Sequence, residues 1–142
     1  ADMFVTKLVE METEVLIAPD AGAAKKIYEA ASRLSYSTEV VIANKKRDVK
    51  TGEIISVDID VAKVRGKRCV VLDDICDGGR TFIELSGYVK SVAKELSLCV
   101  THGIFSKGED VVCDAFDRVI TTNSYADPEQ FKRVEVICKQ YI

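Results

Sequence analysis

The sequence of 142 residues has no run of roughly 18 consecutive apolar residues and contains only one histidine. The missing apolar run excludes a transmembrane helix. The first residues, ADMFVTKLVE, also lack the charged and then apolar pattern of a secretory signal. We therefore expect a soluble, cytoplasmic protein with no membrane partner.

Paired cysteine spacing is also missing. The five cysteines are odd in number and form no CxxC pair, so we expect reduced core residues rather than a disulfide framework. Cys76 is the exception, because it lies inside the candidate site described below. A Cys/His nucleophile pair would have to join it to His102, the single histidine, and we do not expect that pair.

The sequence has little excess charge of either sign. Its formal net charge of −3 argues against a nucleic-acid partner held by bulk charge. Lys45, Lys46, Arg47 and Lys50 form a local basic cluster, which we interpret as local chemistry. With 47% apolar residues and no repeat, linker or low-complexity tract, residues 1–142 are expected to form one compact domain.

Apolar patterns with strand and helix periods alternate along the chain. Strands are expected at residues 14–18, 38–43, 70–72, 98–101, 118–121 and 134–137, and helices at 3–11, 23–34, 80–96 and 109–116. This alternation predicts an α/β fold with a parallel central sheet flanked by helices. Residues 54–59 suggest a short β-ribbon that projects from the sheet, and residues 64–67 a turn into the central strand.

The most informative stretch is CVVLDDICDGGRT, residues 69–81, in which a buried strand leads through a polar turn into a helix beginning at Arg80. Gly78 and Gly79 allow backbone N–H groups to face an anion, and the start of the helix adds further N–H groups and the positive end of its dipole. This turn is a candidate phosphate-binding loop. A Cβ added at Gly79 is expected to block the anion while leaving the fold mostly intact.

Two adjacent carboxylates, Asp73 and Asp74, precede this loop and would repel a phosphate. A polyol or a divalent cation must therefore lie between them and the phosphate. A sugar phosphate with Mg²⁺ satisfies both conditions. The alternative is a surface turn rich in Asp and Gly, which is common in α/β proteins.

A second polar turn, residues 19–23, follows the first strand. Because the carboxyl ends of parallel strands share one edge of a sheet, its Asp20 is expected near Asp73 as a magnesium ligand. The alternative role of Asp20 is the N-cap of the next helix. Lys45 and Arg47 alternate along an extended segment, so both can face one side and hold diphosphate charge, unless the segment is only a solvated basic hairpin.

Two further positions lie at strand ends. His102 is equally compatible with a ligand contact and with a structural role. The hydroxyl-bearing stretch at residues 121–124 is a weaker candidate.

The stretch DDICDGGRT, residues 73–81, resembles the phosphoribosyl diphosphate (PRPP) binding motif of type I phosphoribosyltransferases and of ribose-phosphate diphosphokinases, the PRPP synthetases. That motif usually has Asp-Thr-Gly-x-Thr after its acidic pair, so Gly78 stands where the family usually has Thr. Three more segments resemble those of PRPP synthetases in the same order: PDAGA at 19–23, NKKR at 44–47 and THGIFS at 101–106. The resemblance covers nearly all of residues 14–124 and concerns only the carboxyl-terminal half of that family.

The resemblance implies a type I phosphoribosyltransferase-like fold and transfer of the diphosphoryl group of ATP to ribose 5-phosphate, which makes PRPP for nucleotide biosynthesis. It implies Asp73 and Asp74 at the ribose hydroxyls, Asp20 near Mg²⁺, and Lys45 and Arg47 as the catalytic residues that stabilise the moving diphosphoryl group. It also implies a loop that binds the sugar phosphate, made of Asp77, Gly78, Gly79, Arg80 and Thr81. The family's amino-terminal half, which supplies much of the ATP site, is absent here, so we expect a homo-oligomer or a missing amino-terminal half.

Two alternatives stay open. One is a free-standing phosphoribosyltransferase that consumes PRPP, although no segment outside the core offers a base-binding hood. The other is a non-catalytic domain that binds ribose 5-phosphate or PRPP for regulation; Gly78 in place of Thr favours it, whereas Lys45 and Arg47 argue against it. No aromatic or apolar cluster near these two cations would hold an adenine, so the chain alone is expected to bind the sugar phosphate without making PRPP.

Overall fold

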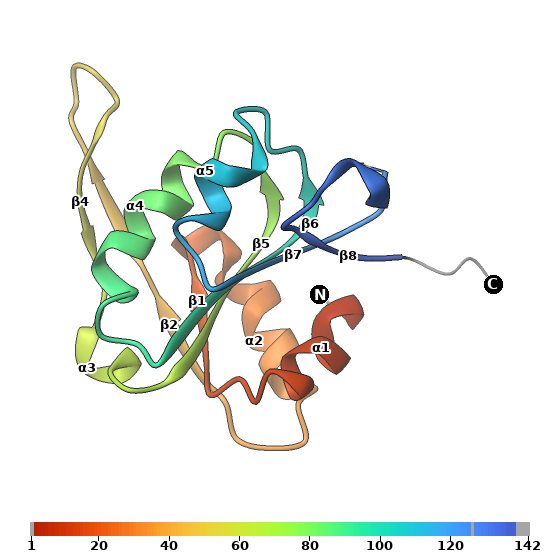
Figure 1. The fold of residues 1–142 in the computed structure, drawn as a ribbon. Coiled ribbons are helices and arrows are strands. Elements are labelled where there is room, and N and C mark those ends of the chain that lie inside the picture. The colour runs from red at the N-terminus through yellow and green to blue at the C-terminus, as the bar shows by residue number, and fades with distance from the viewer. Residues whose placement is uncertain (1, 126, 139–142) are drawn as a thin grey trace.

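The structure is a computed structural model that describes residues 2–125 and 127–138. Its main sheet has six parallel strands in the order β2 (Glu39–Ile42), β1 (Val15–Ala18), β5 (Arg68–Cys76), β6 (Glu95–Gly103), β7 (Arg118–Thr122) and β8 (Glu135–Ile137). An antiparallel ribbon pairs β3 (Asn44–Arg47) with β4 (Ile54–Asp58) and projects from the sheet (Figure 1). The predicted parallel α/β fold with a ribbon is confirmed.

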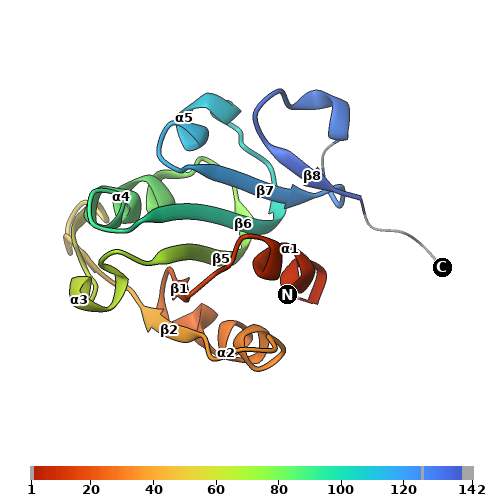
Figure 2. The same cartoon turned by 60° about the horizontal axis from the view of Figure 1, so that its bottom comes forward.

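Helices cover both faces of the sheet (Figure 2). One face packs against α1 (Val5–Glu10) and α2 (Ala24–Ser32), and the other against α3 (Val61–Val64), α4 (Arg80–Val89) and α5 (Glu109–Cys113). Short 3₁₀ turns are η1 (Asp2–Phe4), η2 (Ala21–Ala23) and η3 (Pro128–Gln130). Within the described residues, no helix is both long and apolar enough to cross a membrane.

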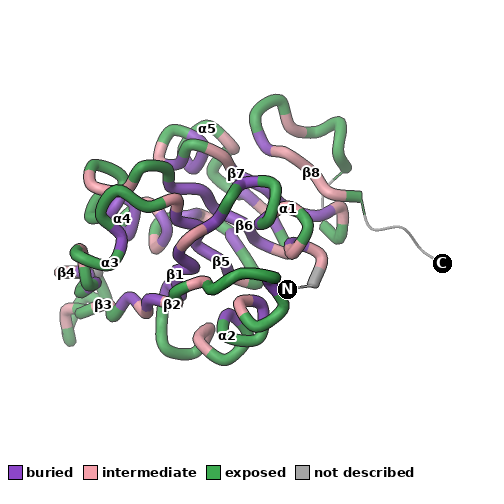
Figure 3. The backbone as a smooth tube through the Cα atoms, turned by 90° about the horizontal axis from the view of Figure 1, so that it is seen from below, coloured by how far each residue is buried: buried purple, intermediate pink, exposed green. Residues whose placement is uncertain are grey.

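The inner strands β1, β5, β6 and β7 are buried on both faces along most of their length, which explains their continuous apolar runs. In β1, Val15 and Ile17 belong to the apolar cluster under α4, whereas Leu16 and Ala18 belong to the cluster under α1 and α2. Figure 3 shows this as buried backbone along the sheet, with exposed residues on the outer surfaces. Ligand-binding groups must therefore lie beyond the apolar stretch of each strand, at its carboxyl end.

The central strand is longer than the sequence pattern predicts. The expected end at Leu72 is wrong, because β6 continues beside β5 and pairs with Ile75 and Cys76. Asp73 and Asp74 thus lie inside a strand instead of in the turn after it. Neighbouring side chains of a strand point to opposite faces, so the two carboxylates are separated.

Other expected boundaries also differ from the structure. The helix that begins at Arg80 ends at Val89 instead of continuing to Leu96, because Leu96 pairs with Cys69 as part of β6. The expected turn into β5 is present at residues 65–67 and follows α3, whose first turn is capped by Asp60: its Oδ1 accepts the Ala62 N–H at 3.2 Å.

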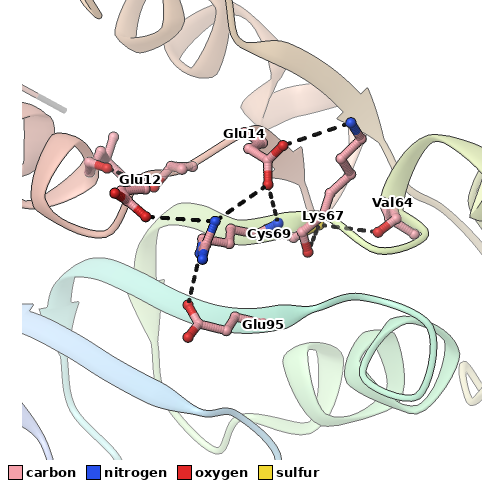
Figure 4. Close-up of polar contacts among 9 residues, drawn as sticks. Glu12, Glu14, Val64, Lys67, Cys69 and Glu95 are labelled. Carbon is pink, nitrogen blue, oxygen red and sulfur yellow. Dashed lines mark hydrogen bonds and ion pairs between the residues drawn. The ribbon is translucent and has the colours of Figure 1, made fainter.

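A charged network joins the amino ends of β1, β5 and β6 (Figure 4). Glu14 accepts the Arg68 N–H at 3.2 Å and lies 3.7 Å from Lys67 Nζ. The Arg68 guanidinium reaches Glu12 at 3.6 Å and Glu95 at 4.0 Å. These pairs fasten the edge of the sheet opposite to the candidate site, and they leave the carboxyl edge for ligands.

Candidate functional site

A cleft of about 420 Å³ lies at the carboxyl ends of β1 and β5, a size typical of small-molecule sites. Its lining residues are Asp20, Lys45, Arg47, Asp73, Ile75, Asp77, Gly78, Gly79, Arg80, Thr81 and Phe82. The cleft therefore brings together every site residue expected from the sequence except Asp74.

The candidate phosphate loop joins β5 to α4 through Gly78 and Gly79. Gly79 is the N-cap of α4 with φ +84°, a left-handed conformation that favours glycine. The first N–H groups of α4 have no acceptor within the helix and face the cleft end of the sheet. The loop thus offers backbone donors to an anion.

The expectation that a Cβ at Gly79 would leave the fold intact is wrong. Such a Cβ would lie 2.6 Å from Val112 Cγ2 of α5, which is closer than van der Waals contact. A Cβ at Gly78, by contrast, would meet only the side chain of Lys107, at ordinary contact distance. Gly79 is required by the packing of α4 on α5 as well as by the loop conformation.

Asp20 has the N-cap role considered for it, and its two carboxylate oxygens have different neighbours. Its Oδ1 accepts the Ala23 N–H at 3.1 Å and caps η2 before α2. Its Oδ2 lies 3.8 Å from Lys45 Nζ. Capping therefore orients the carboxylate without using up its capacity to bind a cation.

The ribbon brings two cations over the cleft. Lys45 and Arg47 both line it, as their alternation predicts, although a register shift lies between Lys46 and Arg47. Arg47 Nη1 donates to Gly52 O at 3.1 Å, which stiffens the tip of the hairpin.

Lys45 is the more enclosed of the two cations, with a side chain only 10% exposed. Burial lowers its pKa, and Asp20 opposes this shift. An ammonium that has lost much of its hydration gains more from a bound anion than one in bulk water, because water screens the interaction less. Lys45 is therefore the stronger candidate for contact with a diphosphate.

The adjacent carboxylates Asp73 and Asp74 have different surroundings. Asp73 is half-buried in the cleft, and burial raises its pKa; the Asp74 N–H, which it accepts at 2.8 Å, opposes the shift, while nearby Asp20 adds to it. Asp74 is exposed and forms an ion pair with Lys26 of α2. Of the two adjacent carboxylates, only Asp73 therefore lies in the cleft, whereas Asp74 lies outside the cleft and is neutralised by Lys26.

The cleft carboxylates fit the demands of Mg²⁺. No group of three or more His, Cys, Asp or Glu side chains that could hold a metal is found in residues 2–125 and 127–138. Mg²⁺, however, usually binds one or two carboxylates and completes its shell with water and substrate phosphate. Asp20 and Asp73 both line the cleft and could supply such a pair of carboxylates.

The other candidates do not line the cleft. Cys76 is buried, and burial raises the pKa of its thiol to about 12, so it cannot be a thiolate nucleophile at neutral pH. His102 does not line the cleft, and its Nδ1 lies 2.7 Å from Ser124 Oγ. The Thr121 and Thr122 hydroxyls donate to backbone carbonyls of β6 at 2.8 and 2.7 Å.

Ile75 and Phe82 also line the cleft, but sequence reasoning did not single them out. Ile75 is 52% exposed, which is unusual for a large apolar side chain in a central strand. Continuing β5 to Cys76 would have identified it, because Ile75 then shares a face with Asp73.

Comparison with known proteins finds one matching family model and several similar proteins. Residues 6–135 match the family model of the phosphoribosyl transferase domain. The chain is 29% identical over 136 residues to a ribose-phosphate pyrophosphokinase of Mycoplasmopsis pulmonis, covering 91% of this chain and 41% of that protein. It is 30% identical over 143 residues to a ribose-phosphate pyrophosphokinase of Bacillus caldolyticus, covering 98% and 43%. The chain thus spans about two fifths of the length of these relatives.

Solved structures share the fold. A phosphoribosylpyrophosphate synthetase from Mycobacterium smegmatis superposes with a TM-score of 0.77 at 22% identity, covering 96% of this chain and 45% of that one. The APRTase from Giardia lamblia, solved with 9-deazaadenine, superposes with a TM-score of 0.71 at 10% identity, covering 84% and 74%. At these identities the likeness concerns the fold alone.

Proposed function

Because the chain belongs to the phosphoribosyl transferase domain family, we propose that its cleft binds ribose 5-phosphate or PRPP together with Mg²⁺ and forms the sugar-phosphate part of a ribose-phosphate diphosphokinase. In the complete enzyme the diphosphoryl group of ATP is transferred to the anomeric oxygen of ribose 5-phosphate, and AMP leaves. One observation supports this most strongly: a glycine loop at a helix start, the carboxylate of Asp73 and the cations Lys45 and Arg47 line a single cleft.

The 5-phosphate is assigned to the loop from Asp77 to Thr81. Backbone N–H groups at the start of α4 donate to the phosphate oxygens, and the Thr81 hydroxyl and the Arg80 guanidinium lie on the same rim. Arg80 Nη2 lies 4.0 Å from Glu53 Oε1, a long distance for an ion pair, and both side chains are about two-thirds exposed. This loose pair leaves the guanidinium free to turn toward a phosphate.

The ribose is assigned to Asp73, which precedes the loop in β5 and lines the same cleft. A carboxylate can accept hydrogen bonds from two adjacent ribose hydroxyls. Asp20 and Asp73 would hold Mg²⁺, which when bound neutralises charge on the diphosphate oxygens. Asp74, in its ion pair with Lys26, acts on the ribose only indirectly, through its N–H bond to Asp73.

Lys45 and Arg47 are assigned to the transferring diphosphoryl group. Phosphoryl-type transfer depends on positioning and on neutralising charge that spreads over oxygen atoms, and it needs no protein nucleophile. Lys45, with its lowered pKa, has lost hydration before the substrate arrives. It can therefore respond to charge that develops in the transition state.

Two measurements test this function. Calorimetry of the chain should show binding of ribose 5-phosphate that Mg²⁺ strengthens, while an AMP-release assay with ATP, Mg²⁺ and ribose 5-phosphate should show no turnover by these residues alone. Fusion to the amino-terminal part of the Bacillus caldolyticus relative should restore turnover. In that fusion Lys45→Met should lower kcat far more than substrate affinity, as for an interaction made chiefly in the transition state.

Lys46→Met is the matched control, because Lys46 is exposed and does not line the cleft. Equal losses in the two variants would remove Lys45 from the reaction. Robust AMP release by residues 1–142 alone would show that they include an ATP site, which would contradict the proposal.

A second candidate is a phosphoribosyltransferase that consumes PRPP. The exposed Ile75 favours it, since an apolar side chain at the mouth of a sugar-phosphate cleft can pack on a flat base. Release of diphosphate from PRPP with a free base, in the absence of ATP, would decide for this reaction.

A further inference from the structure

The loop position Gly78 has no side chain, and a neighbouring lysine occupies the space beside it. A Cβ at Gly78 would lie 3.7 Å from Cε and 3.8 Å from Cδ of Lys107. The ammonium nitrogen is one bond beyond Cε, so it lies within about 5 Å of that point. The stem of Lys107 therefore lies beside Gly78, a residue of the phosphate loop that lines the cleft.

The segment that contains Lys107 is fixed to the phosphate loop by its backbone. The N–H groups of Ile104 and Phe105 donate to Cys76 O at 2.9 and 3.2 Å, and the Ser106 N–H donates to Asp77 O at 3.0 Å. Phe105 has φ +50°, and its ring packs edge-on against Phe131 at 5.3 Å. A non-glycine residue keeps such a conformation only where its surroundings hold it. The approach of Lys107 to Gly78 is therefore a built feature of the fold.

The charge of Lys107 is available to a ligand. The carboxylates that follow it are engaged elsewhere: Glu109 accepts the Lys132 N–H at 3.0 Å, and Asp110 lies 2.9 Å from the Arg133 guanidinium. In the part of the chain that the structure describes, Lys107 forms no ion pair or hydrogen bond. An exposed lysine with a packed stem and an uncommitted ammonium can turn to an anion at small conformational cost.

We propose that Lys107 is a further phosphate-binding residue of the cleft, and that its ammonium supplies at Gly78 the donor which this glycine cannot supply as a side chain. This assignment rests on the proposed function, because the ligand is the 5-phosphate of ribose 5-phosphate. The positive charge of Lys107 would also offset the negative charge of Asp77, whose carboxylate lines the cleft and repels the phosphate.

Calorimetric titration with ribose 5-phosphate tests it across a small set of variants. Lys107→Met keeps the stem and removes the charge, and should weaken affinity by about fivefold, the upper end of what an exposed ion pair contributes. Lys107→Arg should keep near wild-type affinity. Lys94→Met, at an exposed lysine just before β6 on the opposite edge of the sheet, is the matched control and should change nothing.

A second pair of variants separates binding from structure. Gly78→Thr in the Lys107→Met background should recover part of the lost affinity, because a hydroxyl there can donate to the same phosphate and the position has room for a Cβ. The affinity of Lys107→Met should also depend less on salt than that of the wild type.

The outcomes distinguish the two proposals. Wild-type protein that does not bind ribose 5-phosphate overturns the proposed function, and the role of Lys107 with it. Wild-type protein that binds, while Lys107→Met binds equally well or Lys107→Arg is as weak as Lys107→Met, overturns only the role of Lys107.

Discussion

Replacing Asp73 by asparagine should affect ligand binding far more than replacing Asp74 by asparagine. Both residues are acidic and adjacent, and the sequence pattern treats them alike. In the structure Asp73 faces the cleft with Asp20 and Lys45, whereas Asp74 faces α2 and pairs with Lys26. Asp73→Asn should weaken ribose 5-phosphate binding in the presence of Mg²⁺, and Asp74→Asn should leave it nearly unchanged.

The expected magnitude follows from the role of each carboxylate. Asp73→Asn keeps the shape and removes the charge that would accept from ribose hydroxyls or bind Mg²⁺. Hydrogen bonds to charged groups contribute about 1.5–3 kcal/mol, which corresponds to a loss of about 10- to 100-fold in affinity. Stability should not fall, because burial raises the pKa of Asp73 and so disfavours its charged form in the fold.

Calorimetry at fixed Mg²⁺, repeated without Mg²⁺, measures both the affinity and the coupling to the metal. The wild type and Asp74→Asn should gain affinity when Mg²⁺ is added, and Asp73→Asn should gain much less. Equal effects of the two substitutions, or a larger effect at Asp74, would refute the reasoning from strand alternation. Wild-type affinity that is the same with and without Mg²⁺ would contradict the metal bridge.

Three further predictions concern charge and packing. Burial lowers the pKa of Lys45 from its usual 10.5, and the proposed function places the diphosphate of PRPP at this side chain, so PRPP affinity should fall as the pH rises through the lowered pKa; calorimetry of Lys45→Met should show no such alkaline loss. Gly79→Ala should lower the free energy of unfolding by more than about 1 kcal/mol, because Gly79 has a positive φ and an added Cβ would clash with Val112. Gly78→Ala should lower it by at most a few tenths of a kcal/mol. Urea unfolding midpoints measure both effects, and equal losses in the two variants would contradict this prediction. Arg118 lowers the pKa of Glu135 below 4.5 through hydrogen bonds at 2.8 and 2.6 Å, so this pair stabilises the fold above that pH and the stabilisation is lost as the pH falls through the lowered pKa. Thermal unfolding of Glu135→Gln and of the wild type should therefore converge in acid, and a constant difference would contradict the assignment.

The sequence predicts the fold well because the inner strands of the sheet are buried on both faces. Apolar runs such as VLIA in β1 have few other solutions in a domain whose helical segments alternate with them. The candidate phosphate loop was also predictable, since a glycine pair between a strand and a helix has a specific physical meaning.

The sequence could not predict the length over which neighbouring strands pair, and the positions of several site residues depend on that length. The polar residues in DDIC, residues 73–76, do not look like a strand, although they form the end of β5. Pairing with β6 stabilises this end through hydrogen bonds that a local sequence pattern does not reveal. That extension decides that Asp73 and Ile75 face the cleft and that Asp74 faces Lys26. Likewise the contact between Gly79 and Val112 and the position of Lys107 beside Gly78 arise from α5 and from the loop before it, which are distant in sequence.

The central claim is that the loop from Asp77 to Thr81 binds the phosphate of a pentose phosphate. Amide chemical-shift mapping by NMR tests it most directly, because it reports on the backbone donors themselves. Titration with ribose 5-phosphate and Mg²⁺ should shift the amides of residues 77–81 most, with smaller shifts at Asp20 and on the ribbon, and ribose without phosphate should leave the loop amides nearly unmoved. Shifts concentrated elsewhere, for example near Tyr36 at the opposite edge of the sheet, or equal shifts with ribose alone, would contradict the account.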